Sequence, residues 1–210
     1  MDGNNRWSKK KKISKLNAYK SGAKNLLKLS KYIFNNYKIK NISAFALSTH
    51  NLNRTHNFDK TFISILDIFV LEHESFQIDF KINFIGDLSF IKNQKLIDSI
   101  KKIENNFINS KFTLNIFMNY SGRDDIINAA KKFDINYDKK KFNELLSTNI
   151  LPDPEILIRT GGFKRISDFM LFELSFTDLF FSKKLWPELN IRDIDKYIFQ
   201  FSKIERKFGI

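Results

Sequence analysis

Short apolar segments alternate along the chain with longer segments in which apolar residues recur at helical spacing. The short segments are rich in β-branched and aromatic residues, and they predict strands at 42–48, 81–85, 112–118 and 155–159, with a weaker one at 179–181. Helical spacing predicts helices at 19–37, 59–76, 93–107, 124–133 and 194–204. Such alternation predicts an α/β fold with a central, mostly parallel sheet flanked by helices, and we expect a single domain over residues 1–210.

Polar residues stand where several of these strands end. Ser48 closes the first predicted strand, Asn119 follows the segment 112–118, and Arg159 closes the segment 155–159. Because ligands of such sheets bind beyond the carboxyl ends of the strands, we expect these residues to gather there together with Asp2.

The segment from Arg159 to Ser167 has the composition of an anion site. Gly161 and Gly162 let the backbone turn sharply and approach a ligand closely. The segment carries the cations Arg159, Lys164 and Arg165. Ser167 lies near the start of the next apolar-periodic segment, so its hydroxyl and the free N–H groups of a helix start would face the same anion. Phosphate or diphosphate is the expected ligand. The alternative interpretation of this segment is a strand-to-helix turn whose arginines are only solvated.

Composition narrows the kinds of site that are possible. The chain has 210 residues, 42% of them hydrophobic, no cysteine and three histidines. Disulfides and thiolate metal sites are therefore excluded, and any metal should be a hard ion bound by oxygen. No apolar run approaches the roughly 20 residues needed to cross a bilayer, and the N-terminus does not resemble a signal peptide, so we expect a cytoplasmic protein.

The net charge of +13 raises the alternative of a basic nucleic-acid-binding domain. The lysines are spread along the chain, however, and no known nucleic-acid module accompanies them, so we expect no nucleic-acid partner. The one dense run, Lys9 to Lys12, would suit phosphates or an anionic membrane surface, although such runs are more often only solvated.

Several motifs in consistent order resemble those of the cis-prenyltransferases, most closely the bacterial undecaprenyl diphosphate synthases. They are Met1-Asp2-Gly3-Asn4, Ile85-Gly86-Asp87, Pro152-Asp153-Pro154, Arg159-Thr160-Gly161-Gly162, Leu185-Trp186-Pro187 and Glu205-Arg206-Lys207-Phe208-Gly209. The resemblance covers essentially the whole chain. It implies a Mg²⁺-dependent enzyme that condenses isopentenyl diphosphate onto an allylic diphosphate, usually farnesyl diphosphate, and so forms a Z-polyprenyl diphosphate. Such a product, for example undecaprenyl diphosphate, is the precursor of a glycan lipid carrier. A homodimer with transient, peripheral contact to the membrane surface during product release is also implied.

The same resemblance assigns roles to individual residues. It implies that Asp2, Ser48 and Asn51 take part in catalysis and that Asp2 and Asp178 bind Mg²⁺. The allylic diphosphate would be held by Gly3, Asn4 and Arg6, and isopentenyl diphosphate by Arg159, Arg165 and Ser167. Further substrate-binding positions are Trp7, Lys15, Tyr19, Leu52 and Arg54.

Phenylalanines supply a second expectation. The residues Phe58, Phe62, Ile65, Leu66 and Phe69 form a helical stripe, and Phe45, Phe84 and Phe117 lie on predicted strands. A stripe of this kind is more often plain core than a pocket. The family resemblance nevertheless implies an apolar tunnel between such helices and the sheet, which takes up the growing prenyl chain.

Departures from the family pattern fall inside the implied site. Tyr19 replaces a histidine, His50 a glutamate and Lys15 an arginine, while Phe163-Lys164 replaces Glu-His. A tyrosine with an ordinary pKa near 10 is a poor general base at neutral pH. A catalytically impaired partner subunit is therefore the alternative. We expect an active enzyme, because both acidic positions and the principal arginines are kept.

In the family, the segment that matches Met1–Asn4 follows a buried central strand. This chain begins at Met1, so either its start is assigned too late or the sheet lacks that strand. We expect the former, because loss of a central strand would leave two neighbouring strands with unpaired backbone groups.

Overall fold

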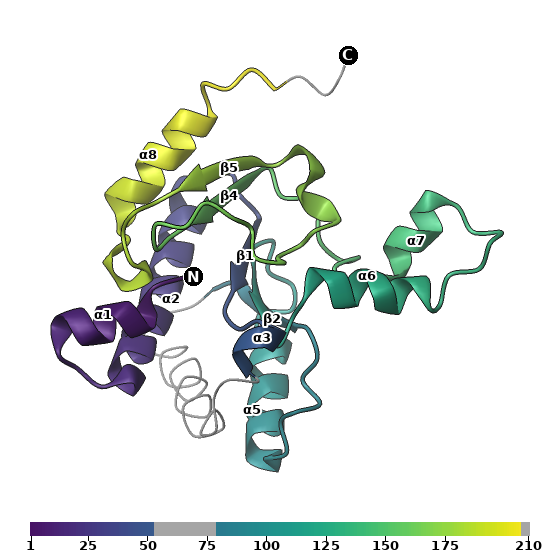
Figure 1. The fold of residues 1–210 in the computed structure, drawn as a ribbon, viewed down its shortest axis with the longest axis horizontal. Coiled ribbons are helices and arrows are strands. Elements are labelled where there is room, and N and C mark those ends of the chain that lie inside the picture. Colours follow the sequence, from purple (N-terminus) through teal and green to yellow (C-terminus); the bar gives the residue numbers. More distant parts are fainter. Residues whose placement is uncertain (53–78, 207–210) are drawn as a thin grey trace.

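The computed structural model describes residues 1–52 and 79–206, and within them it has two parallel sheets (Figure 1). The first sheet has the order β1-β3-β2, with strands β1 (Asn41–Phe45), β2 (Lys81–Ile85) and β3 (Thr113–Phe117). The second pairs β4 (Ile156–Arg159) with β5 (Asp178–Phe181). The predicted parallel α/β fold is confirmed, with the described strands divided between two sheets.

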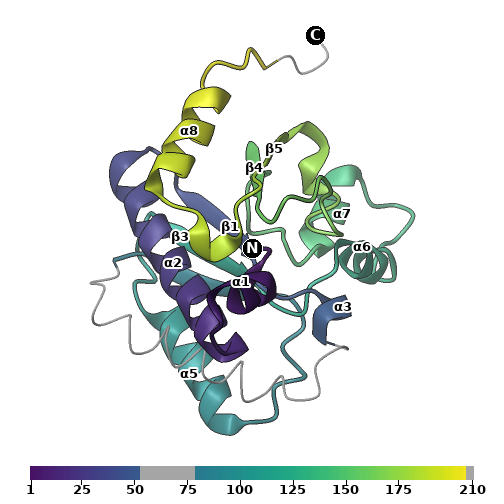
Figure 2. The same cartoon turned by 60° about the vertical axis from the view of Figure 1, so that its left-hand side comes forward.

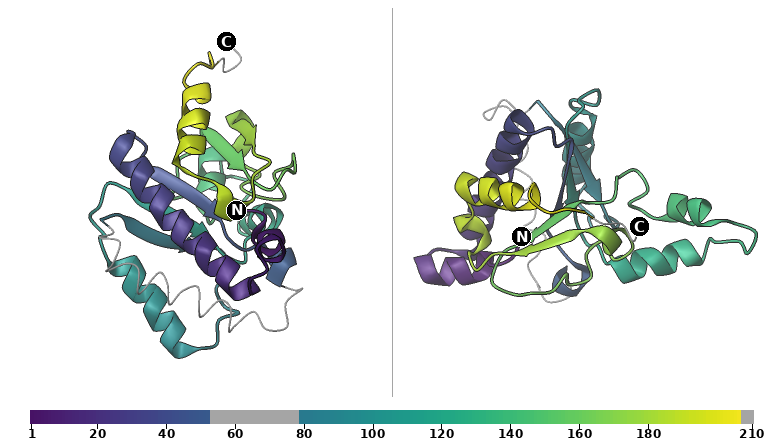
Figure 3. Two further views of the ribbon diagram at one scale, coloured as in Figure 1. Left: turned by 90° about the vertical axis from the view of Figure 1, so that its left-hand side faces the viewer. Right: turned by 90° about the horizontal axis from the view of Figure 1, so that it is seen from above.

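Helices precede, connect and follow these strands (Figure 2). They are α1 (Asn4–Lys11), α2 (Lys15–Asn36), α3 (Thr49–Leu52), α5 (Gln94–Asn105), α6 (Gly122–Ala130), α7 (Lys139–Leu145), α8 (Ile191–Phe201) and the 3₁₀ helices η1 (Glu173–Phe176) and η2 (Trp186–Glu188). Figure 3 shows α6 and α7 projecting away from the rest of the described chain. No helix in the described ranges has the length and apolar character needed to span a membrane.

The main core forms where α2, α5 and α8 pack against the first sheet. Leu27 of α2, Ile100 of α5 and Ile194 of α8 are buried in one cluster with Ile82 and Leu114 of the strands. Each helix contributes one apolar stripe, as its periodicity predicts. This core fixes α2 and the sheet in place, and the N-terminal segment lies against the first half of α2 and the carboxyl end of β1.

A second, smaller core is aromatic. Phe117, Tyr120 and Phe169 are buried together, and the ring of Phe45 stacks on Phe169 with 4.8 Å between centroids. Phe117 therefore belongs to the packed interior, in keeping with the plain-core interpretation. The stripe from Phe58 to Phe69 and the helix predicted at 59–76 lie outside the described residues, so the prenyl tunnel stays a prediction.

Some elements differ from the predicted ones for local reasons. The first strand ends at Phe45 because the N–H groups of Ala46 and Leu47 both donate to the Phe117 carbonyl, at 3.0 and 3.1 Å, which breaks the regular ladder. Helices α1 and α7 were not predicted, since their sequences are mostly polar and lack an apolar period.

The first two residues link the ends of the two sheets. The Met1 nitrogen donates to the Phe45 carbonyl at the end of β1 at 3.2 Å, and the Asp2 N–H donates to Thr160 Oγ1, just after β4, at 3.0 Å. Strands β1 and β4 are not paired with each other. Asp2 is thus placed at the carboxyl ends of both sheets, where the sequence predicted a site. The expectation about a strand before Met1 stays a prediction.

Candidate active site

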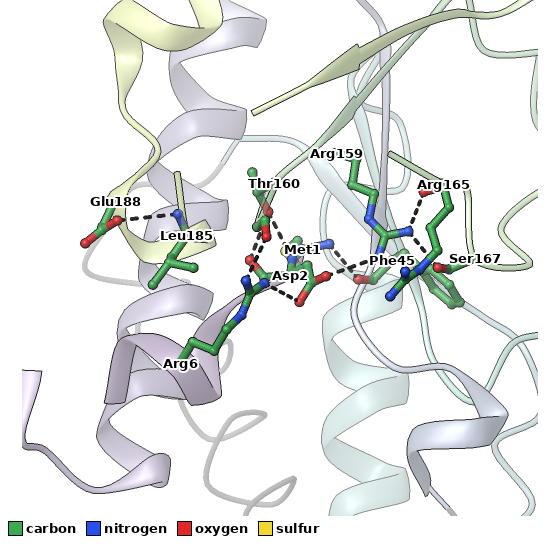
Figure 4. A network of polar contacts seen from close by, with 11 residues as sticks. Met1, Asp2, Arg6, Phe45, Arg159, Thr160, Arg165, Ser167, Leu185 and Glu188 are labelled. Carbon is green, nitrogen blue, oxygen red and sulfur yellow. Dashed lines mark hydrogen bonds and ion pairs between the residues drawn. The ribbon is translucent and has the colours of Figure 1, made fainter. Parts of the chain in front are cut away.

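The Asp2 carboxylate lies between two guanidinium groups that come from distant parts of the chain (Figure 4). Its Oδ1 accepts from Arg6 Nη2 at 3.3 Å, and its Oδ2 accepts from Arg159 Nη2 at 3.1 Å. The Arg159 side chain is only 14% exposed, whereas those of Asp2 and Arg6 are 36% and 46% exposed. The site is therefore open to solvent on the Arg6 side and enclosed on the Arg159 side.

Backbone contacts hold Asp2 in position. Its carbonyl accepts from the Trp186 N–H at 2.9 Å and from Thr160 Oγ1 at 3.1 Å. Trp186 is in turn anchored through its indole N–H to the Gly22 carbonyl of α2 at 2.9 Å. The sequence pattern did not single out Thr160 or Trp186 as site residues, although both lie in motifs that carry the family resemblance. Their part in the site depends on contacts between distant segments.

The start of α1 presents Arg6 to Asp2. Gly3 has a φ of 113°, and its carbonyl accepts from the Trp7 N–H at 2.8 Å, so the helix begins directly after Asp2. The four-residue spacing then places Arg6 on the same side as Asp2. Asn4 packs against Gly22, where a Cβ would lie 2.5 Å from Asn4 Oδ1. One helix start therefore carries Gly3, Asn4, Arg6 and Trp7, and of these Arg6 contacts the carboxylate.

Arg159 also organises the loop that follows β4. Its Nη1 donates to Ser167 Oγ at 2.6 Å and to the Arg165 carbonyl. The predicted trio of Arg159, Arg165 and Ser167 is thus brought together. No α-helix begins at Ser167, contrary to expectation: Ser167 and Asp168 have φ values of 52° and 65°, and a left-handed turn leads to the 3₁₀ helix η1 instead. The free N–H groups of a helix start are therefore not part of this site.

The two glycines have a different role from the predicted one. The Gly161 N–H donates to the Lys184 carbonyl at 2.7 Å and the Gly162 N–H to the Ser182 carbonyl at 2.9 Å, so neither is available to an anion. A Cβ on Gly161 would lie 2.5 Å from Arg6 Nη2, and the Gly161 carbonyl accepts from Arg6 Nη1 at 2.8 Å. Gly161 thus permits close approach of Arg6 rather than of a ligand, and side chains must supply the anion contacts.

Ser48 lies at the same edge of the first sheet. It forms an isolated parallel bridge with Tyr120, which follows β3, and the neighbouring Asn119 donates through Nδ2 to the Asp87 carbonyl at 3.0 Å. The ends of β1, β2 and β3 therefore meet here, as predicted. Asn51 and Leu52 end the short helix α3, where the structure describes only their backbone, and Arg54 lies outside the described residues.

Lys15 and Tyr19 occupy the first turns of α2. Lys15 is exposed at the first position, and Tyr19 is half-buried one turn further on. Burial raises the pKa of the Tyr19 hydroxyl, and a hydrogen bond with Asn5 opposes this only in part. Tyr19 is therefore protonated at neutral pH and cannot serve there as a general base.

Asp178 is not placed beside Asp2 within the described chain. It pairs with Ile156 at the start of β4, whereas Arg159 at the other end of that strand pairs with Phe181. The pair Ile156–Asp178 is three residues along the strands from the pair Arg159–Phe181, which corresponds to about 10 Å. Asp178 Oδ2 instead lies 3.7 Å from Arg206 Nε. Across residues 1–52 and 79–206, no group of three or more histidine or acidic side chains is arranged to hold a metal, so the metal role of Asp178 stays a prediction.

Comparisons with known proteins agree with these features. A family model described as putative undecaprenyl diphosphate synthase matches residues 1–209. An isoprenyl transferase of Prochlorococcus marinus subsp. pastoris is 37% identical, with 100% of this chain and 81% of that protein covered. A Buchnera aphidicola protein named ditrans,polycis-undecaprenyl-diphosphate synthase ((2E,6E)-farnesyl-diphosphate specific) is 36% identical and covers 100% of this chain and 88% of its own length.

A solved structure extends the similarity to the fold. Lavandulyl diphosphate synthase from Lavandula x intermedia, crystallised in complex with dimethylallyl diphosphate, superimposes with a TM-score of 0.90 at 27% identity. The match covers 100% of this chain and 95% of that one. Because the family model spans nearly the whole chain and these relatives align over its full length, the chain belongs to the undecaprenyl diphosphate synthase family and is a cis-prenyltransferase.

Proposed function

We propose that this chain condenses isopentenyl diphosphate onto an allylic diphosphate, with farnesyl diphosphate as the primer, to form a Z-polyprenyl diphosphate such as undecaprenyl diphosphate. The observation that carries the proposal is the placement of Arg6 and Arg159 on the two oxygens of Asp2. Two guanidinium groups around one carboxylate can hold two diphosphates side by side, because each offers a fork of donors that matches phosphate oxygens.

The two cations divide the site into two halves. Arg6, at the open side, would hold the allylic diphosphate together with the start of α1. Arg159, with Arg165 and Ser167, would hold isopentenyl diphosphate on the enclosed side. In the reaction, the bond between the allylic C1 and its diphosphate oxygen breaks, C4 of isopentenyl diphosphate bonds to C1, and a proton leaves C2. Arg6 stabilises the negative charge that develops on the leaving oxygen.

The leaving diphosphate is the proposed proton acceptor. Tyr19 stands where the family pattern has a histidine, and it keeps its own proton because burial raises the pKa of its hydroxyl. A diphosphate oxygen that has just lost its bond to carbon lies next to the reacting carbons and can take the proton instead.

Asp2 fits a Mg²⁺ ion that arrives with the diphosphate. The ion is usually bound through one or two carboxylates plus substrate phosphates, so it does not need a cage of protein ligands. Asp2 supplies one hard, partly exposed carboxylate at the place where both diphosphates would meet. When bound, Mg²⁺ would neutralise charge on the leaving diphosphate.

Surface features support the remaining parts of the proposal. Phe176, Leu179 and Phe199 expose 64%, 44% and 63% of their area on η1, β5 and α8, and a second copy of the chain in a homodimer would cover them. The basic last turn of α1, with Lys9, would suit brief contact of a cytoplasmic enzyme with an anionic membrane surface as the product leaves.

The test is incorporation of labelled isopentenyl diphosphate into farnesyl diphosphate by the purified protein with Mg²⁺. We expect a ladder of butanol-extractable products whose formation stops with EDTA and resumes when Mg²⁺ is restored. Incorporation no higher than that of Asp2→Ala would refute the proposal. Incorporation that requires a second prenyltransferase chain would instead favour a partner subunit.

A further inference from the structure

The aromatic ring of Phe163 lies among three guanidinium groups of the candidate site. The ring centroid is 4.2 Å from Cζ of Arg165, 5.0 Å from Cζ of Arg6 and 5.9 Å from Cζ of Arg159. These arginines come from the start of α1, the end of β4 and the loop after it, and Phe163 lies in that same loop. A single side chain therefore contacts the cations of both halves of the proposed site.

The ring is held in place by the double-glycine turn. Gly161 and Gly162 have φ values of 87° and 83°, and both N–H groups are bonded to carbonyls of the segment that follows β5. The turn places the Phe163 ring over the Arg6 guanidinium group. The ring remains 41% exposed, so it lies at the solvent-accessible side of the site.

Electrostatics explains why an aromatic ring is suitable here. Asp2 is the carboxylate that pairs with Arg6 and Arg159, and no carboxylate among the described residues pairs with Arg165. The negative face of an aromatic ring attracts guanidinium groups, and Arg can also stack on it. Unlike a carboxylate, the ring leaves the net positive charge of the arginines and their N–H donors available to an incoming anion.

We propose that Phe163 is a positioning residue that orients Arg6 and Arg165 toward the two diphosphate groups and thereby sets the affinity of the site for diphosphate. This inference rests on the proposed function for the identity of the anion. It does not depend on turnover, because orientation of the arginines acts on binding of any diphosphate, including inorganic pyrophosphate.

The test replaces Phe163 by ring-fluorinated phenylalanines with one, two and three fluorine atoms. Each fluorine withdraws electron density from the ring face and leaves the shape nearly unchanged, so the attraction for guanidinium weakens stepwise. Titration calorimetry with inorganic pyrophosphate, at fixed ionic strength, should show a monotonic rise in Kd that reaches about two- to fivefold for the trifluorinated ring. Phe163→Leu should reach at least the same loss.

A matched control is Phe133, which is 38% exposed and contacts the rings of Tyr137 and Phe142 on the α6–α7 projection. The same fluorinated series at Phe133 should leave pyrophosphate affinity unchanged. A flat series at Phe163 would overturn the inference. So would a Phe163→Leu variant whose KM rises for farnesyl diphosphate while its pyrophosphate affinity is unaltered, because the ring would then contact the prenyl chain.

The outcomes separate this inference from the proposed function. A graded loss of pyrophosphate affinity in a protein that incorporates no isopentenyl diphosphate would sustain the role of Phe163 and refute the proposed reaction. Unchanged pyrophosphate affinity across the fluorinated Phe163 variants, in a protein that forms polyprenyl products, would support the proposed reaction and refute the role of Phe163.

Discussion

Asp2 Oδ2 accepts a hydrogen bond from Arg159 Nη2 at 3.1 Å across 157 positions of the chain. The bond ties the first residues to the last residue of β4, and it engages the same carboxylate that we propose as the Mg²⁺ ligand. A diphosphate that reaches Arg159 must therefore compete with Asp2, whereas Mg²⁺ would draw Asp2 and the diphosphate together. Asp2 should therefore weaken anion binding without Mg²⁺ and strengthen it when Mg²⁺ is present.

The Asp2→Asn variant tests this dependence. Without Mg²⁺ it should bind inorganic pyrophosphate more tightly than the parent protein, since a repelling charge is removed and the arginines are released. With Mg²⁺ it should bind less tightly, and incorporation should fall by at least about a hundredfold. Calorimetry with and without Mg²⁺ measures the change in pyrophosphate affinity under each condition. The surface variant Asp98→Asn should change neither the pyrophosphate affinity nor the incorporation. Equal changes in affinity for Asp2→Asn with and without Mg²⁺ would contradict the proposed role of Asp2.

Arg159→Lys should weaken the isopentenyl diphosphate half of the site. A lysine keeps the charge but cannot reach Asp2, Ser167 and the Arg165 carbonyl at once, as the fork of Arg159 does. We expect kcat/KM for isopentenyl diphosphate to fall about ten- to hundredfold, mainly through KM. The exposed Arg192 on α8 offers a control, since Arg192→Lys should leave steady-state kinetics unaltered. An Arg159→Lys enzyme with parental KM would count against the assignment.

Gly161→Ala and Gly162→Ala form a matched pair. Both positions have left-handed backbone, so either alanine should cost about 1–2 kcal/mol of folding stability. At Gly161 the added Cβ would also collide with Arg6 Nη2, whereas at Gly162 nothing lies within 4 Å. Chemical denaturation should show similar losses for the two variants, and only Gly161→Ala should lose most of its activity through displacement of Arg6. Equal activities would show that this close approach is unimportant.

Features of the site that lie within one short segment could be predicted from the sequence, whereas contacts between distant segments could not. The segment 155–159 is predicted as a strand because its apolar run needs no distant partner to be recognised. The trio Arg159, Arg165 and Ser167 is also local, because Arg159 ends β4 and the other two lie in the loop that follows it. The engagement of the Gly161 N–H by the Lys184 carbonyl could not be predicted, because it depends on how the segment after β5 folds back. Of the anion donors predicted from the sequence pattern, only the N–H groups of a helix start at Ser167 are contradicted, and the anion site itself stays a prediction.

The same reasoning applies to the fold. Strand β3 is buried on both faces, and its sequence is mostly apolar although it contains Thr113 and Asn115. By contrast, α1 is a polar helix whose start is fixed by the conformation of Gly3 and by packing against α2. Ser167 was expected to open a helix because apolar residues follow it at helical spacing. Its left-handed backbone and that of Asp168 prevent this, and such a turn leaves no trace in the hydrophobic period.

Glu173 is a buried carboxyl group at the start of η1. It is 7% exposed, its Oε1 accepts from the Thr148 hydroxyl, and its Oε2 is buried with no partner among the described residues. Burial raises the pKa of this carboxyl above its ordinary value of 4.5, and the hydrogen bond from Thr148 opposes the rise only in part. The folded protein therefore retains a proton that the unfolded chain has already lost.

Stability should consequently fall as the pH rises from 4.5 through the raised pKa of Glu173, because over that window the unfolded chain binds fewer protons than the folded one. Glu173→Gln removes the buried charge, so it should flatten the profile and raise stability at neutral pH by about 1 kcal/mol, or about 2–4 °C in Tm. Thermal denaturation between pH 4.5 and 8 measures this. Glu144→Gln is the control: the pKa of that exposed carboxyl is lowered by Lys141, so its loss should not alter the slope above pH 4.5. A Glu173→Gln protein with the parental slope would show that Glu173 stays ionised in the fold.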